Sequence, residues 1–202
     1  MTKIVFAILI ALGWGANLRA QELSAEAGFG GNLDVSPSLF WNLSCNYAFN
    51  DYLDAAGGIH VVRGRLKYSG NGYEVDDRVY KLNGMLSLNA YTPSYRNFGL
   101  FGGASFSFEL LPVDFTTVRH IETDREYWKA RFSRFNPACW LNAGVSYMID
   151  DVGYWSVGVV YSPRYDLYAG YRNLHVNGTY VGLASSSLHY WGLFLRFSTR
   201  DL

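Results

Sequence analysis

Residues 188–198 read Leu-His-Tyr-Trp-Gly-Leu-Phe-Leu-Arg-Phe-Ser, and their alternation decides the fold. Successive side chains of a β-strand point to opposite faces. One face of this strand is then wholly apolar, whereas the other carries a glycine, an arginine and a serine. The apolar face consists of Trp191, Leu193, Leu195 and Phe197. A strand of this kind suits a sheet whose two sides meet different surroundings.

The same alternation recurs in seven segments upstream. They span residues 23–31, 38–49, 52–68, 79–91, 98–111, 138–149 and 154–162. An even number of strands with an apolar outside and a polar inside is typical of a transmembrane β-barrel, and closure removes the sheet edges that lipid does not tolerate. The sequence therefore predicts a closed antiparallel eight-stranded up-and-down transmembrane β-barrel. A secreted soluble sandwich or lipocalin-like barrel is the alternative, and it would have to bury the faces that carry Trp41, Trp155 and Trp191.

Composition agrees with a single membrane-exposed domain. The chain has 202 residues, of which 50% are hydrophobic, yet its mean hydropathy is only −0.02. Apolar and polar residues are therefore finely interleaved. Aromatic residues make up 17%, which suits the aromatic girdles at the two membrane interfaces. Charge is balanced, with 17 basic and 17 acidic residues, so there is no electrostatic basis for binding nucleic acid.

The first 20 residues have the pattern of a secretory signal peptide. Lys3 supplies the positive charge, residues 4–14 form the apolar run, and Leu18-Arg19-Ala20 offers a cleavage site. The run is too short to span a bilayer as a helix. The mature domain is then the barrel of residues 21–202, located in the outer membrane of a Gram-negative cell. An even strand count places both termini in the periplasm.

The connections alternate between short and long. Those after the second, fourth and sixth strands are short, as periplasmic turns are, whereas those after the third, fifth and seventh are long, as external loops are. The longest connection, residues 112–136, contains Thr123-Asp124-Arg125-Glu126, which has the pattern of a capping box. Two structures remain open for the segment that follows: a short surface helix over residues 127–132, or a hairpin.

Alternation also places the two cysteines. Cys45 and Cys139 fall on the apolar faces of the second and sixth strands, which lie on opposite sides of an eight-stranded barrel. A disulfide requires Cα atoms within about 7 Å. We therefore expect two unpaired thiols.

Charged residues on the inner face need partners, and four of them can form two pairs. Glu26 and Arg196 lie near the same end of the first and last strands, which become neighbours on closure. Lys81 and Glu109 lie near the other end of adjacent strands. We expect two interior ion pairs with a structural role in a filled lumen, unless bulges shift one member of a pair away.

Three cations continue the apolar face of the third strand. Arg63, Arg65 and Lys67 follow Val61 at alternate positions, above the expected hydrocarbon. They are candidates for contacts with lipopolysaccharide headgroups. The alternative is a solvated extension of the sheet.

The sequence lacks the motifs of common catalytic and metal sites. We expect no catalytic residues, metal or cofactor, because the four histidines are scattered and no phosphate loop or nucleophile elbow is present: His60, His120, His175 and His189. An enzyme that modifies lipid A is the alternative, since Ser187 and His189 lie at the outer end of the last strand. The residues after His189 depart from the deacylase pattern.

The last strand resembles the C-terminal assembly signal of bacterial outer-membrane barrels. Tyr190, Gly192, Leu195 and Phe197 occupy its polar, glycine, hydrophobic and aromatic positions, although five residues follow the aromatic one. The whole mature chain resembles the small OmpX, OmpA-barrel, OmpW and PorT-like proteins, the last from Bacteroidota. The resemblance implies a non-enzymatic membrane protein that acts through external loops or as an accessory subunit of a larger envelope complex; a channel for small hydrophobic molecules is another alternative. Tyrosines and tryptophans within residues 127–135 and 165–180 suit protein or glycan contacts, or else the interfacial girdle.

Overall fold

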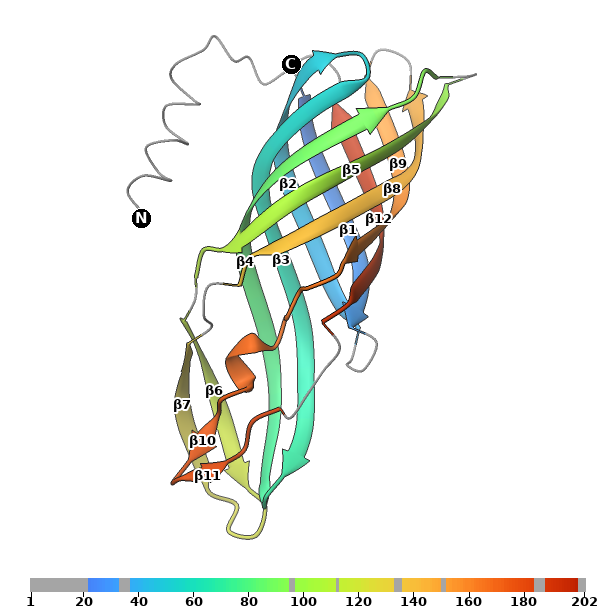
Figure 1. Cartoon of the computed structure of the whole chain (residues 1–202). Helices are drawn as coiled ribbons and strands as arrows, with labels where there is room; N and C mark the ends of the chain where they lie inside the picture. Colours follow the sequence, from blue (N-terminus) through green and yellow to red (C-terminus); the bar gives the residue numbers. More distant parts are fainter. Residues whose placement is uncertain are drawn as a thin grey trace, which may run out of the picture.

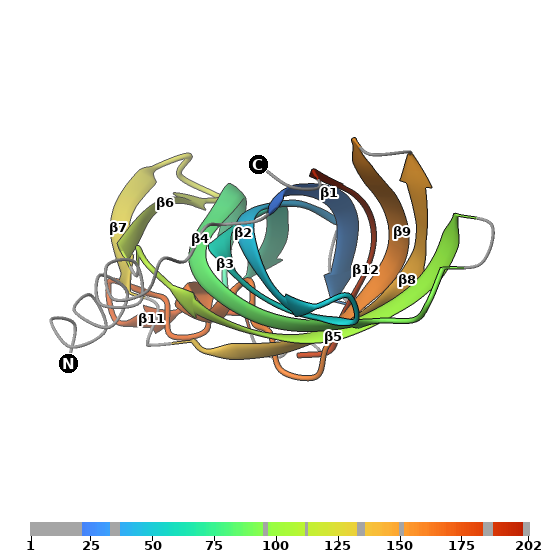
Figure 2. The same ribbon diagram turned by 90° about the horizontal axis from the view of Figure 1, so that it is seen from above.

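Eight antiparallel strands close into a barrel (Figures 1 and 2). The computed structural model describes residues 22–32, 37–94, 97–111, 113–132, 136–149, 152–183 and 188–199, so the expected signal peptide lies outside it. The barrel strands are β1 (Glu22–Asn32), β2 (Ser38–Asn50), β3 (Leu53–Gly70), β4 (Tyr73–Tyr91), β5 (Phe98–Glu109), β8 (Ala138–Ile149), β9 (Gly153–Ser162) and β12 (Tyr190–Thr199). Their order is β3-β2-β1-β12-β9-β8-β5-β4, and pairing of β3 with β4 closes the ring. The predicted fold is confirmed.

The smaller elements all belong to the long connections. They are β6 (Val113–His120), β7 (Glu126–Phe132), the 3-10 helix η1 (Ala169–Tyr171), β10 (His175–Val176) and β11 (Thr179–Tyr180). β6 and β7 form a hairpin, and β6 also pairs with residues 73–75 of β4. Of the two structures open for residues 127–132, the hairpin is therefore the correct one. The helix signal there is local, whereas β7 gains a full ladder of pairs with β6.

The outer surface of the barrel is an apolar band. Period two places alternate side chains outside, and many large ones are exposed: among them Leu43, Ile59, Leu86, Leu100, Leu141, Val157, Leu193 and Leu195. Aromatic rings flank the band, with Trp41, Tyr80 and Trp191 toward one end and Phe98, Tyr147 and Trp155 toward the other. A closed sheet with this surface matches a lipid environment. Within the described part of the chain, no helix is long and apolar enough to span a membrane.

The two ends of the barrel differ. At the turn end, short connections join β2 to β3, β4 to β5 and β8 to β9, and β1 begins and β12 ends there (Figure 1). At the opposite loop end, β3 and β4 continue well past the other strands as one long hairpin, beside which lie β6, β7, β10 and β11 (Figure 1). The expected separation of short turns from long loops is confirmed for these connections.

Glycine at position 28 makes room inside the barrel. A Cβ atom on Gly28 would lie 2.3 Å from Cζ of Phe40 and 2.4 Å from the carbonyl oxygen of Leu193. The ring of Phe40 therefore lies against bare backbone of β1. This close approach lets large aromatic side chains fill a barrel of only eight strands.

Both cysteines are free and exposed on the outer surface, as the alternation predicts. Because Cys45 and Cys139 lie within the apolar band, both thiols should react slowly with a water-soluble maleimide when the barrel is in a bilayer and fast after unfolding. Mass spectrometry of the labelled protein measures both rates. An intramolecular disulfide formed without unfolding would contradict the strand order.

Candidate functional site

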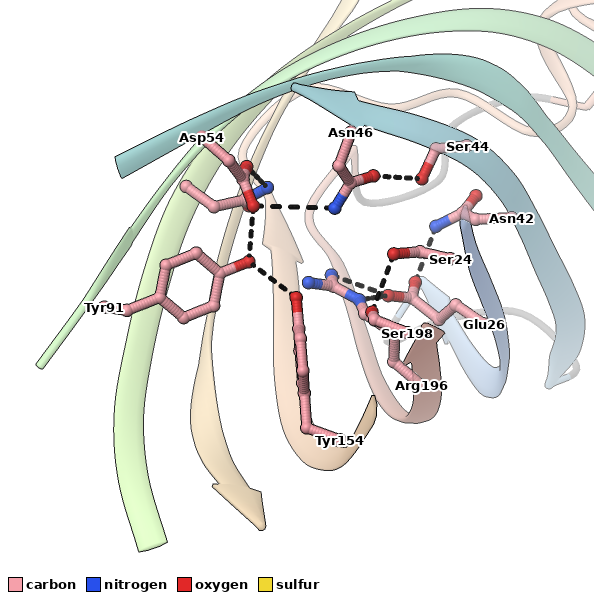
Figure 3. A network of polar contacts seen from close by, with 11 residues as sticks. Ser24, Glu26, Asn42, Ser44, Asn46, Asp54, Tyr91, Tyr154, Arg196 and Ser198 are labelled. Carbon is pink, nitrogen blue, oxygen red and sulfur yellow. Dashed lines mark hydrogen bonds and ion pairs between the residues drawn. The ribbon is translucent and has the colours of Figure 1, made fainter. Parts of the chain in front are cut away.

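A charged pair lies on the inner wall of the barrel, where the first and last strands are neighbours (Figure 3). Glu26 and Arg196 lie directly opposite each other in the ladder of β1 and β12. Nη2 of Arg196 lies 2.7 Å from Oε2 of Glu26, and the two side chains are only 11% and 5% exposed. Asn42 of β2 donates a 2.5 Å hydrogen bond to the other carboxylate oxygen. The structure thus brings together the two charged residues that the sequence places on the first and last strands.

A second polar network lies nearer the turn end (Figure 3). The buried carboxylate of Asp54 accepts hydrogen bonds of 2.7 Å from Nδ2 of Asn89 and from the hydroxyl of Tyr91. The Tyr91 hydroxyl lies 3.5 Å from that of Tyr154, which donates to Glu22 at 2.9 Å. Next to this network, a cavity of about 620 Å³ opens at the turn end of the barrel. Alternation puts Asp54 on the inner face, but its partners are amide and phenol groups, so no opposite charge marks this network in the sequence.

Aromatic rings fill the loop-end half of the lumen. The ring of Trp140 from β8 lies 5.0 Å from His60 of β3, 5.3 Å from Tyr190 of β12 and 4.6 Å from Tyr165, a residue of the β9–β12 connection. Phe40 contacts both His60 and Tyr190 edge-on. The layer therefore joins four barrel strands, β2, β3, β8 and β12, to the β9–β12 connection.

The other expected pair lies beside this aromatic layer. Nζ of Lys81 lies 2.5 Å from Oε1 of Glu109, and the side chains are 6% and 3% exposed. Nearby, Nε1 of Trp140 donates a 2.8 Å hydrogen bond to the hydroxyl of Ser107. Two desolvated ion pairs thus link neighbouring strands at different heights, and removing one partner of either would leave an uncompensated buried charge.

The space between the polar and aromatic layers is small. A cavity of about 30 Å³ is lined by polar groups of Glu26, Asn42, His60 and Asn142, among others. This volume holds about two water molecules. Apolar side chains such as Phe40 and Val160 also line it, but neither ring nitrogen of His60 has a hydrogen-bond partner among the described residues, and water in the cavity would supply one. The lumen is therefore a packed interior.

Beyond the loop end the long connections form a second packed structure, here called the headpiece. It consists of residues 64–79 of the β3–β4 hairpin, the β6–β7 hairpin and residues 163–183 (Figure 1). Its buried apolar side chains come from all three parts: Leu66, Tyr73, Val75, Val118, Leu167, Tyr168, Tyr171, Leu174, Val176 and Val181. One face of the extended sheet is thus covered by the β9–β12 connection.

Hydrogen bonds fix that connection in place. The hydroxyl of Tyr171 donates to Asp77 at 2.8 Å, and that of Tyr68 donates to the carbonyl oxygen of Val181 at 2.6 Å. Nδ2 of Asn71 donates to the carbonyl oxygen of Tyr180 at 2.7 Å, and Asp166 pairs with Arg172. The headpiece is therefore held by side chains as well as by strand pairing.

The tyrosines of the β9–β12 connection differ from their expected role. Tyr165, Tyr168 and Tyr171 are 1%, 1% and 0% exposed, so they build the interior instead of contacting partners or the girdle. Alternation does not reveal this, because the segment is not a strand. Tyr180 of the same connection is 38% exposed and keeps the expected role open, and the more exposed apolar side chains of the headpiece are Trp128 on β7, at 75%, and Ile121 in the β6–β7 turn, at 54%.

Burial of Tyr168 predicts an alkaline transition of the headpiece. Burial raises the pKa of its hydroxyl from 10.0 to about 12. Between these values the unfolded segment ionises while the folded one stays neutral, so headpiece stability should hold below pH 10 and fall as the pH rises toward 12. Tyrosinate absorbance at 295 nm measures the step. Tyr168→Phe should lower the amplitude of the step by one tyrosine, and an unchanged amplitude in that variant would contradict the assignment.

The three cations expected at the headgroups lie on the outer face of β3 as predicted. Arg65 makes bidentate contact with Asp76, at 2.9 and 2.8 Å, and Lys67 lies 3.4 Å from Glu74. The guanidinium of Arg63 lies over the ring of Tyr80, 5.5 Å from its centroid. All three therefore sit where the apolar band gives way to the headpiece.

The residues considered for catalysis are placed only in part. Ser187 lies outside the described residues. His189 stacks on Tyr161, and Nδ1 lies 2.7 Å from the tyrosine hydroxyl. Among the described residues, no group of three or more histidines, cysteines and carboxylates could hold a metal ion.

The residues of the expected assembly signal lie on both faces of β12. Tyr190 is buried in the lumen and donates or accepts a 2.7 Å hydrogen bond with Ser38, whereas Leu195 is exposed on the apolar band. The ring of Phe197 packs 5.0 Å from that of Trp155. Gly192 lies beside the ring of Phe40, where a Cβ atom would come within 2.9 Å. Their role in assembly remains a prediction.

Comparison with known proteins identifies the architecture. No family model and no curated protein sequence matches the chain. Among solved structures, Neisserial surface protein A has a TM-score of 0.54 at 14% identity, covering 91% of this chain and 98% of that one. OprG from Pseudomonas aeruginosa has a TM-score of 0.49 at 10% identity, with 91% and 98% covered. The strand order, the closed ring and the first of these likenesses show that the chain has the fold of the small eight-stranded outer-membrane β-barrels.

Proposed function

We propose that this protein is an integral outer-membrane barrel that acts without catalysis, through its headpiece. It binds a ligand at the cell surface directly or serves as an accessory subunit of a larger envelope complex. The apolar band supports the membrane location, and the short turns support an orientation with the turn end and both termini in the periplasm.

The observation that carries this proposal is the packing of the headpiece. Closure of the barrel requires pairing of the strands only within the lipid, yet β3 and β4 extend far beyond it and bury side chains such as Leu66 and Val75 against the β9–β12 connection. Ordered external structure of this kind presents fixed side chains to a partner. The lumen is filled by two ion pairs and a layer of aromatic rings, which supports a role for the protein outside the barrel.

Trypsin added to intact cells tests the orientation. Arg125 lies in the exposed β6–β7 turn, so external trypsin should cleave there and leave the barrel in the outer-membrane fraction. Arg125→Gln is the control that should resist this cut. Cleavage only after lysis would reverse the orientation, and recovery in the soluble fraction would overturn the membrane location.

Trp128 offers a test of binding. It is 75% exposed on β7, and aromatic side chains are enriched at protein interfaces. Trp128→Ala should abolish stoichiometric recovery of a partner in mild detergent, or binding of cells to their surface ligand, without changing the heat-induced gel shift of the barrel. Leu86→Ala, on the apolar band, is the control. Unchanged recovery and binding in Trp128→Ala would count against the headpiece as the binding surface.

A further inference from the structure

The outer surface of β3 and β4 changes from apolar to basic within a few residues. Along the ladder, Val61 pairs with Leu82, Arg63 with Tyr80, and Arg65 with Arg78. These pairs lie on the same face of the sheet, the one that faces outward. Arg63, Arg65, Lys67 and Arg78 form a basic surface, here called the basic collar. It lies between the apolar band and the tip of the headpiece.

The collar has more positive charge than its own carboxylates neutralise. Asp76 is engaged by Arg65, whose hydrogen bonds hold the pKa of that carboxyl below its usual value, and Glu74 is engaged by Lys67. Among the described residues, neither Arg63 nor Arg78 has a carboxylate at ion-pair distance. Arg78 adds to the electrostatic lowering of the pKa of Asp76, but neither it nor Arg63 forms an ion pair, so the four cations outnumber the two carboxylates of this surface.

The surroundings of these arginines suit an anion attached to a lipid. Tyr80 lies opposite Arg63 in the ladder and two residues from Arg78 on β4, and its ring contacts the guanidinium of Arg63. On the other side of Arg63, β2 presents Leu39, which is 52% exposed, and then Trp41 further down the band. An arginine fork matches phosphate geometry, and the strip below it matches acyl chains.

We propose that Arg63 and Arg78 bind the phosphate of a membrane glycolipid, with its acyl chains along Leu39, Trp41 and Val61. This inference names the lipid partner of the barrel and rests on the proposed membrane location. The source of the phosphate is the lipid headgroup, because the cations adjoin the apolar band and not the tip of the headpiece.

Native mass spectrometry of the detergent-purified barrel tests the site. The probe is a bis-phosphorylated lipid A, titrated against its dephosphorylated form. The double variant Arg63→Gln/Arg78→Gln should bind the phosphorylated probe at least about tenfold more weakly, which corresponds to about 1.4 kcal/mol. The dephosphorylated probe should bind the unaltered protein as weakly as the phosphorylated probe binds the variant.

The matched control is Arg119→Gln/Arg125→Gln in the β6–β7 hairpin. It also removes two arginines, one of which lies over a tyrosine ring, Tyr127, at 5.5 Å. Its affinity for the probe should not change, and heat-induced gel shifts verify that both variants fold. Equal binding by the collar variant would overturn the site, and competition by free pyrophosphate at the same concentration as the lipid would overturn the lipid source. This measurement uses purified protein, so its result does not depend on which side of the membrane the headpiece faces. The lipid site and the proposed orientation can therefore be contradicted separately.

Discussion

Replacing Glu26 by alanine should lower the free energy of unfolding of the barrel by about 3–5 kcal/mol. Arg196 would keep its charge in the lumen, where its side chain is only 11% exposed and its guanidinium lies 5.0 Å from the ring of Phe194 and 5.3 Å from that of Phe101. Attraction to aromatic faces compensates only a fraction of the free energy that it costs to bury an unpaired charge. Urea unfolding in lipid vesicles, followed by tryptophan fluorescence, measures the change.

Two variants separate the lost charge partner from other effects. Glu26→Leu/Arg196→Met removes both charges and should recover most of the stability, because an apolar pair of similar volume often replaces a buried ion pair without cost. Asp76→Asn breaks an exposed pair and should leave the urea midpoint unchanged. If Glu26→Ala destabilised the barrel no more than Asp76→Asn, the pair would not be desolvated in the way that the structure shows.

The contact between Glu26 of β1 and Arg196 of β12 can be predicted from the sequence, because it follows from two rules. Closure makes β1 and β12 neighbours, and period two puts Glu26 and Arg196 on the inner face, so their meeting follows from the register. The same rules place Lys81 near Glu109. They also place Cys45 and Cys139 on the outer surface, where the structure has them.

The remainder of the site depends on contacts that no period encodes. Asp54 binds Asn89 and Tyr91, whose partners could be any polar group on the inner face. The β9–β12 connection has no alternation, and Tyr171 finds its place against Asp77, 94 residues away in sequence. In the β6–β7 segment the capping box predicts a helix, but the ladder of pairs between β6 and β7 outweighs this signal.

Truncating Leu66 to alanine should unfold the headpiece and leave the barrel closed. Leu66 is 2% exposed and lies on the part of β3 that has passed the barrel, where it packs within the headpiece interior. Loss of a fully buried leucine costs about 2–5 kcal/mol. Most of that cost falls on the β9–β12 connection, which is held by side chains and a few hydrogen bonds. Hydrogen exchange of residues 163–183 should rise, and trypsin should cut at Arg172.

Two controls decide whether the headpiece is a separate unit. Val62→Ala lies four residues earlier on the same strand, is fully buried in the lumen, and should lower the urea midpoint of the barrel. Ile121→Ala, in the exposed turn, should change neither the barrel nor the exchange rates. If Leu66→Ala lowered the barrel midpoint together with headpiece protection, the two parts would unfold as one cooperative structure. The extended strands would then serve barrel stability, and the main argument for a dedicated binding headpiece would be lost.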